Sequence, residues 1–132
     1  MKTIIFILFL FATGIQAQEK IQTQKIMNEV FDSFTNLMDL NYPFDEFITG
    51  KNDEKIKTHL EIIRGAFSKS NHNKTFKQVG FSPSFKTIVE YLDLTIDSFK
   101  SGHKQFAHAR LAGLPNLCLS CHAQLSDSYS SQ

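Results

Sequence analysis

The only two cysteines of the chain are three residues apart, and a histidine follows the second one directly. They are Cys118 and Cys121, with His122 next in the sequence. On a helix, residues three apart lie on one face, so both thiols can bond to the same planar group. The imidazole of His122 can then ligate an iron ion in that group as its proximal ligand. This spacing is typical of c-type haem attachment through two thioether bonds.

The same two thiols permit three other interpretations. A redox-active Cys-x-x-Cys pair normally follows a strand, and the sequence predicts no strand. A disulfide between Cys118 and Cys121 would close a very short loop and contribute little stability. A zinc site would need two further ligands, for which His103 and His108 are available, although without paired spacing. The sequence therefore favours one covalent haem c, anchored by Cys118 and Cys121 and ligated by His122.

The elements that must position this motif are predicted by the hydrophobic pattern. Apolar residues recur at helical spacing in four segments, which we expect at about residues 19–40, 53–68, 83–100 and 103–126. In the first segment the apolar positions are Met27, Val30, Phe31, Phe34, Leu37 and Met38. No segment alternates with period two. The fold class predicted is all-α, an antiparallel four-helix bundle with the Cys-His motif on its last helix.

Prolines and glycines set the predicted helix ends. A residue before proline avoids the α conformation, so the first helix should end before Pro43, and residues 41–52 should form a loop. Ser82-Pro83 is typical of a helix start, and Gly102 of a helix stop. We expect a kink or short break at Gly113–Pro115, because proline lacks the backbone donor and crowds the preceding turn. The last residues, from 126 onward, are polar and should fray.

The first seventeen residues are typical of a secretory signal peptide. Lys2 gives a basic start, residues 4–12 form an uncharged apolar run, and a cleavage site follows at Ala17. The run is well short of the roughly 20 residues that span a bilayer. We therefore expect residues 1–17 to be removed and residues 18–132 to form one exported, soluble domain without a membrane span.

Composition excludes several classes of protein. The chain has 132 residues, of which 42% are hydrophobic and 20% charged, so it is not disordered and suits one small domain. Fourteen basic and thirteen acidic residues give a net charge of +1, which predicts no nucleic-acid partner. No grouping of acid, base and nucleophile suggests catalysis. We expect a binding or carrier protein rather than an enzyme.

A signal peptide, four predicted helices and one Cys-x-x-Cys-His motif on the last helix resemble the cytochrome c′ family, the class II c-type cytochromes of the bacterial periplasm. The residues that carry the resemblance are Cys118, Cys121 and His122. Leu125 and Ser126 stand where the family usually has an aromatic and a basic residue, so the chain resembles a divergent member. The resemblance implies a periplasmic location, redox partner proteins and, as in many members, a homodimer.

The resemblance also implies which residue faces the iron opposite His122, because in this family that residue comes from the first helix. Met27 lies about where it would fall, and a sixth ligand there would give iron suited to electron transfer. Met27 could instead fill space in the core, as methionines commonly do. Met38 lies three turns further along. An apolar residue in that place would leave five-coordinate iron that binds NO or CO, for sensing or scavenging.

The haem propionates would need cations. The only arginines are Arg64 and Arg110, both in predicted helices, and a planar guanidinium suits a carboxylate. Either could equally be an ordinary surface residue. His59 falls on the apolar face of the second helix, where a boundary histidine is more common than a ligand. The function predicted is an exported mono-haem electron carrier, with gas binding at a five-coordinate haem as the alternative.

Overall fold

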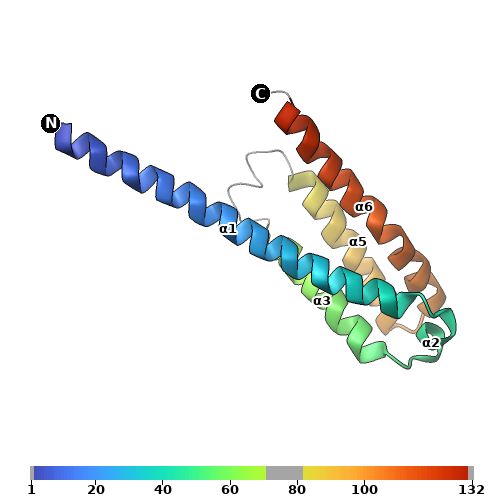
Figure 1. Cartoon of the computed structure of the whole chain (residues 1–132). Helices are drawn as coiled ribbons and strands as arrows, with labels where there is room; N and C mark the ends of the chain where they lie inside the picture. Colours follow the sequence, from blue (N-terminus) through green and yellow to red (C-terminus); the bar gives the residue numbers. More distant parts are fainter. Residues whose placement is uncertain (1, 71–81, 131–132) are drawn as a thin grey trace.

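The computed structural model describes the backbone of residues 2–70 and 82–130, and the side chains of residues 22–70 and 84–123. Throughout the described backbone the regular structure is helical, which confirms the predicted all-α class. The helices are α1 (Lys2–Asn41), α2 (Phe44–Thr49), α3 (Asp53–Ser70), α5 (Ser82–Lys100) and α6 (Lys104–Ser130). Figure 1 shows the four long helices side by side near the short α2.

The ends of the middle helices follow from ordinary capping chemistry. Asp53 and Glu54 lie in the first turn of α3 and Lys69 in its last, which complements the helix dipole. Gly102 follows α5 with a φ of +80°, a conformation that side chains other than glycine rarely adopt. The predicted bounds of α3 and α5 are therefore confirmed to within two residues.

The predicted loop over residues 41–52 is wrong, because α2 forms inside it. The carbonyl oxygen of Pro43 accepts a hydrogen bond from the backbone N–H of Phe47, at 3.0 Å. Asp45 lies in the first turn, where the helix dipole favours negative charge. Phe47 is fully buried. A six-residue helix is too short to show a hydrophobic period in the sequence. Its formation depends instead on the burial of the Phe47 ring.

The two outer helices also differ from the sequence prediction. The first was predicted to begin near residue 19, but α1 is helical from Lys2. The last was predicted to kink or break at Gly113–Pro115 and to fray from residue 126. It has no break, because α6 runs through Pro115 to Ser130. The local terminating signal at Pro115 therefore does not end the helix.

One hydrophobic core joins the long helices. α1 packs chiefly on α3, α3 also packs on α5, and α5 packs on α6, while α1 and α6 touch much less. The buried apolar side chains of this core are Val30, Leu37, Phe47, Ile56, Leu60, Ile63, Ala66, Phe67, Phe85, Ile88, Leu92, Ile96, Phe99, Ala107, Leu111 and Leu114. Away from α2, α1 diverges from α6 (Figure 1). The two helices therefore present partly uncovered sides.

The α2 end of the molecule is held by aromatic and ionic contacts. The Phe47 ring packs edge-on against Phe99 and His108, with centroid distances of 5.6 and 5.3 Å. Lys104, in the first turn of α6, donates to both carboxylate oxygens of Asp53 at 2.8 and 2.6 Å. These contacts fix the beginnings of α3 and α6 beside α2. Among the described residues, no helix is long and apolar enough to span a membrane.

Candidate functional site

The two cysteines extend the buried face of α6. Ala107, Leu111 and Leu114 are buried on this helix, and the next positions at the same helical spacing are Cys118 and Cys121. Both cysteines are half-buried with free thiols, and Cys121 packs against the core. The structure thus places the two thiols on one helical face, as the sequence predicted. They lie at the edge of the hydrophobic core.

Burial raises the pKa of both thiols. For Cys118 the loss of solvation is the largest cause, and the neighbouring Cys121 raises the pKa further, while a backbone hydrogen bond lowers it. For Cys121 loss of solvation alone raises the pKa. Both groups are therefore protonated at neutral pH. Redox-active Cys-x-x-Cys pairs typically contain a thiol of lowered pKa, whereas this environment raises the pKa of both thiols.

His122 lies on the side of α6 that faces α1. His108, Pro115 and His122 are spaced by seven residues, so they share one side of the helix. The Nε2 atom of His108 is 3.1 Å from the carbonyl oxygen of Asn41, the last residue of α1. The same side of α6 therefore carries His122 about four turns further on, with its side chain exposed.

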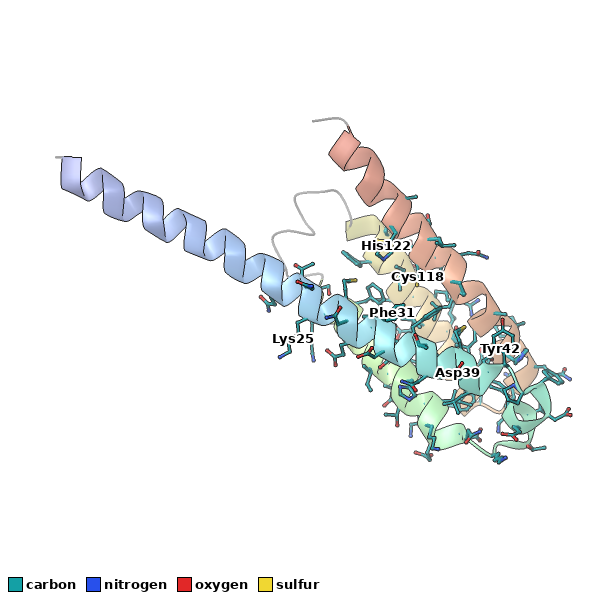
Figure 2. All side chains as sticks on the ribbon, in the orientation of Figure 1. Lys25, Phe31, Asp39, Tyr42, Cys118 and His122 are labelled. Carbon is teal, nitrogen blue, oxygen red and sulfur yellow. The ribbon has the colours of Figure 1, made fainter. Side chains whose placement is uncertain are left out.

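α1 carries Met27 and Phe31 one turn apart. Met27 is half-buried against the core, as are Phe34 and Met38 on the same side. Phe31 is 68% exposed. Figure 2 shows Phe31 on the side of α1 towards α6, whereas Lys25 and Asp39 extend away from it. An exposed phenylalanine therefore stands beside the widening space between the two helices.

The relative heights of these residues follow from the contact between Asn41 and His108. The chain runs towards the α2 end in α1 and away from it in α6 (Figure 1). Phe31 and Cys118 each lie ten residues from that contact, and Met27 and His122 each lie fourteen. At about 1.5 Å per residue, each member of the second pair is ~21 Å along its helix. Met27 and His122 thus lie at similar distances along their helices from the α2 end.

One large apolar side chain is exposed within the motif. Leu119, between the two cysteines, is 67% exposed. Phe31 of α1 and Leu119 are two of the large hydrophobic side chains that the described part of the chain leaves exposed. Such side chains gain free energy when an apolar group covers them. A planar hydrophobic group bonded to Cys118 and Cys121 would have this effect.

The predicted propionate ligands are engaged elsewhere. The Nε atom of Arg64 is 2.8 Å from the carboxylate of Asp93, which links α3 to α5 and raises the pKa of the guanidinium through that hydrogen bond and charge. Arg110 donates to the Thr95 hydroxyl and to the carbonyl oxygen of Tyr91, at 3.1 and 3.2 Å. Propionate binding by either arginine therefore stays a prediction. A propionate would have to share the guanidinium with these partners.

The other described histidines, His59, His103 and His108, do not join the motif. His103 is exposed at the start of α6, and His108 contacts Phe44 and Phe47 of α2. His59 is half-buried on α3, as a boundary residue, and its Nδ1 atom has no hydrogen-bond partner within the described structure. In the described part of the chain, no three His, Cys, Asp or Glu side chains gather into a possible metal site. A zinc site built on the cysteines gains no support.

Sequence reasoning missed two residues near this site. Phe31 was assigned to the apolar face of its helix, but that face is wider than the core it covers, so Phe31 remains outside. Tyr91 was not singled out, although its hydroxyl contacts α6 two turns before Cys118. The edge position of Phe31 on the helical wheel could have indicated its exposure. No sequence pattern could have indicated the contact of Tyr91.

Comparison with protein-family models, with curated protein sequences and with solved structures finds no match to this chain. No relative therefore supplies a function or a residue role. The function is inferred from the residues of α1 and α6 described above, and from the chemistry that their types and positions permit.

Proposed function

We propose that the protein is an exported mono-haem c-type cytochrome that carries electrons. In this proposal the long helices form the antiparallel four-helix bundle of a class II cytochrome. The observation that carries it is the motif on α6: two half-buried cysteines on the continued core face, with His122 on the side towards α1, at a similar distance from the α2 end to Met27. A haem attached there would lie between α1 and α6.

Each residue of the motif has a separate task in this proposal. Cys118 and Cys121 form thioether bonds that hold the haem, and the imidazole of His122 ligates the iron. Phe31 and Leu119 cover the haem faces and exclude water, which would explain their exposure in the protein chain. The bound haem supplies one-electron chemistry, and the chain supplies attachment, orientation and a low-dielectric surrounding.

The sixth position decides between an electron carrier and a gas-binding protein. Met27 is half-buried on α1, at a similar distance from the α2 end to His122, which supports a thioether ligand and electron transfer. Phe31, one turn further along the same side, supports the second candidate. Its exposed ring could cover the iron instead and leave five-coordinate haem that binds NO or CO.

The test is the visible absorption spectrum of the reduced protein, produced with a c-type haem maturation system. The electron-carrier proposal expects sharp low-spin bands that carbon monoxide does not change. The Met27→Ala variant should become high-spin and bind carbon monoxide, because the iron loses its sixth ligand.

Met38→Ala is the matched control, since Met38 lies on the same side of α1 and is also half-buried. It should keep the low-spin spectrum. A wild-type spectrum that is broad, high-spin and sensitive to carbon monoxide would instead support the gas-binding candidate and exclude Met27 as ligand.

A further inference from the structure

Pro115 interrupts the hydrogen bonding of α6 three residues before Cys118. Because proline has no backbone N–H, the carbonyl group of Leu111 lacks its usual helical donor, and the ring crowds the preceding turn. Such a site commonly bends a helix. The direction in which α6 continues beyond Pro115 sets where Cys118 and His122 lie, yet the helix is unbroken. Contacts from outside α6 must therefore support this turn.

Tyr91 of α5 supplies one such contact. Its hydroxyl group donates to the carbonyl oxygen of Arg110 at 2.6 Å, in the turn that precedes Pro115. Gly113 makes this approach possible, because a Cβ atom at that position would lie 2.7 Å from the Tyr91 oxygen. The glycine that seemed to weaken α6 instead admits the tyrosine hydroxyl.

Arg110 also contacts Tyr91 and its neighbour Thr95 on α5. Its guanidinium carbon lies 3.9 Å from the centroid of the Tyr91 ring, within the range of a cation–π contact. Its Nε atom donates to the Thr95 hydroxyl at 3.1 Å, and the Thr95 hydroxyl donates to the Tyr91 carbonyl oxygen at 2.7 Å. Tyr91 is therefore held by its ring, its hydroxyl and its own carbonyl group.

We propose that Tyr91 is a positioning residue for the Cys-His motif. By bonding to the turn before Pro115, it fixes the direction of the following turns, which carry Cys118, Cys121 and His122. These residues lie three to seven positions beyond Pro115, or ~5–10 Å along the helix. The inference rests on the proposed haem attachment for its functional meaning, whereas the contact itself can be tested without haem.

The contact is tested by urea unfolding of Tyr91→Phe, Gly113→Ala and the double variant. Tyr91→Phe should raise the unfolding equilibrium constant about fivefold, as expected for one lost hydrogen bond. Gly113→Ala should destabilise the wild-type chain, because its Cβ meets the hydroxyl. In the Tyr91→Phe background, Gly113→Ala should lower the unfolding equilibrium constant about fivefold, because alanine has a higher helix propensity than glycine. Additive effects of the two substitutions would overturn the contact.

The positioning role is tested by the absorption spectrum of the haem-loaded variants. Tyr91→Phe should change the fraction of high-spin iron, since the axial histidine is displaced relative to α1. Tyr42→Phe is the control, because Tyr42 follows α1 directly and its side chain is 83% exposed. It should match the wild type.

Two further results would each overturn the positioning role. A wild-type spectrum in Tyr91→Phe, together with reduced stability, would show that Tyr91 only stabilises the fold. Absence of haem from the wild-type protein would remove the role along with the proposed function, while the stability measurements would still decide whether the contact exists.

Discussion

At the scale of single residues, the proposed haem attachment depends on the two half-buried thiols of α6. Burial raises the pKa of Cys118 and Cys121 above that of a solvent-exposed cysteine, about 8.5. At neutral pH neither thiol is ionised in the folded or the unfolded chain, so neither affects stability there. Above the ordinary pKa the unfolded chain loses these protons first. Stability therefore falls as the pH rises through the raised pKa of the folded thiols.

The expected loss of stability at high pH can be measured. The contribution of the two thiols to the free energy of unfolding should be constant up to about pH 8 and then decrease. The variant with Cys118→Ser and Cys121→Ser shares every other titrating group, so subtracting its urea unfolding profile isolates the thiols. A difference that does not change between pH 7 and pH 10 would contradict burial of the cysteines.

The residue types of this candidate site can be predicted from the sequence, whereas their surroundings cannot, and the role of these residues in haem binding stays a prediction. Cys118, Cys121 and His122 are recognised because their spacing is local and a helix places them without help from the rest of the chain. The partners of Arg110 are not recognised, because Thr95 and Tyr91 lie on another helix. The exposure of Phe31 depends on how far α1 diverges from α6, which is a property of the packed molecule.

At the scale of the helices, local signals predict most ends but not the way that tertiary contacts alter them. Gly102 ends α5 as expected, since a positive φ suits glycine. Pro115 does not end α6, because Tyr91 and Gly113 together support the turn before it. Phe47 draws residues 44–49 into a helix, because its ring fills a place beside Phe99. In each failure a contact distant in sequence outweighs the local preference.

The ion pair between Lys104 and Asp53 is a helix-scale feature with a testable contribution. It joins the first turns of α6 and α3, and the Lys104 side chain is only 19% exposed. Lys104→Met keeps most of the side-chain volume and should lower the free energy of unfolding by about 1 kcal/mol, because Asp53 loses a charged donor. Chemical denaturation measures this change.

Lys51→Met is the matched control, since the pair of Lys51 and Glu46 is 2.7 Å long but largely exposed to solvent. It should change stability by a few tenths of a kcal/mol at most. Equal effects of the two substitutions would show that the contact between the first turns of α3 and α6 adds nothing beyond surface charge.

At the scale of the whole molecule, the packing is uneven in a way that suits the proposed site. The core is continuous from α1 through α3 and α5 to α6, and the α2 end is closed by Phe47, His108 and Lys104. From that end α1 and α6 diverge (Figure 1), and α1 carries Met27 and Phe31 while α6 carries the Cys-His motif. The α2 end of the fold is thus closed, and the residues of the proposed haem site lie towards the other end.

The central claim is that one haem is bound covalently through Cys118 and Cys121. The direct measurement is the mass of the denatured polypeptide after production with a c-type haem maturation system, for the wild type and the Cys118→Ser, Cys121→Ser double variant. The account predicts that the wild-type chain gains the mass of one haem that survives denaturation and that the double variant gains none. A wild-type chain that stays at the polypeptide mass would contradict the account.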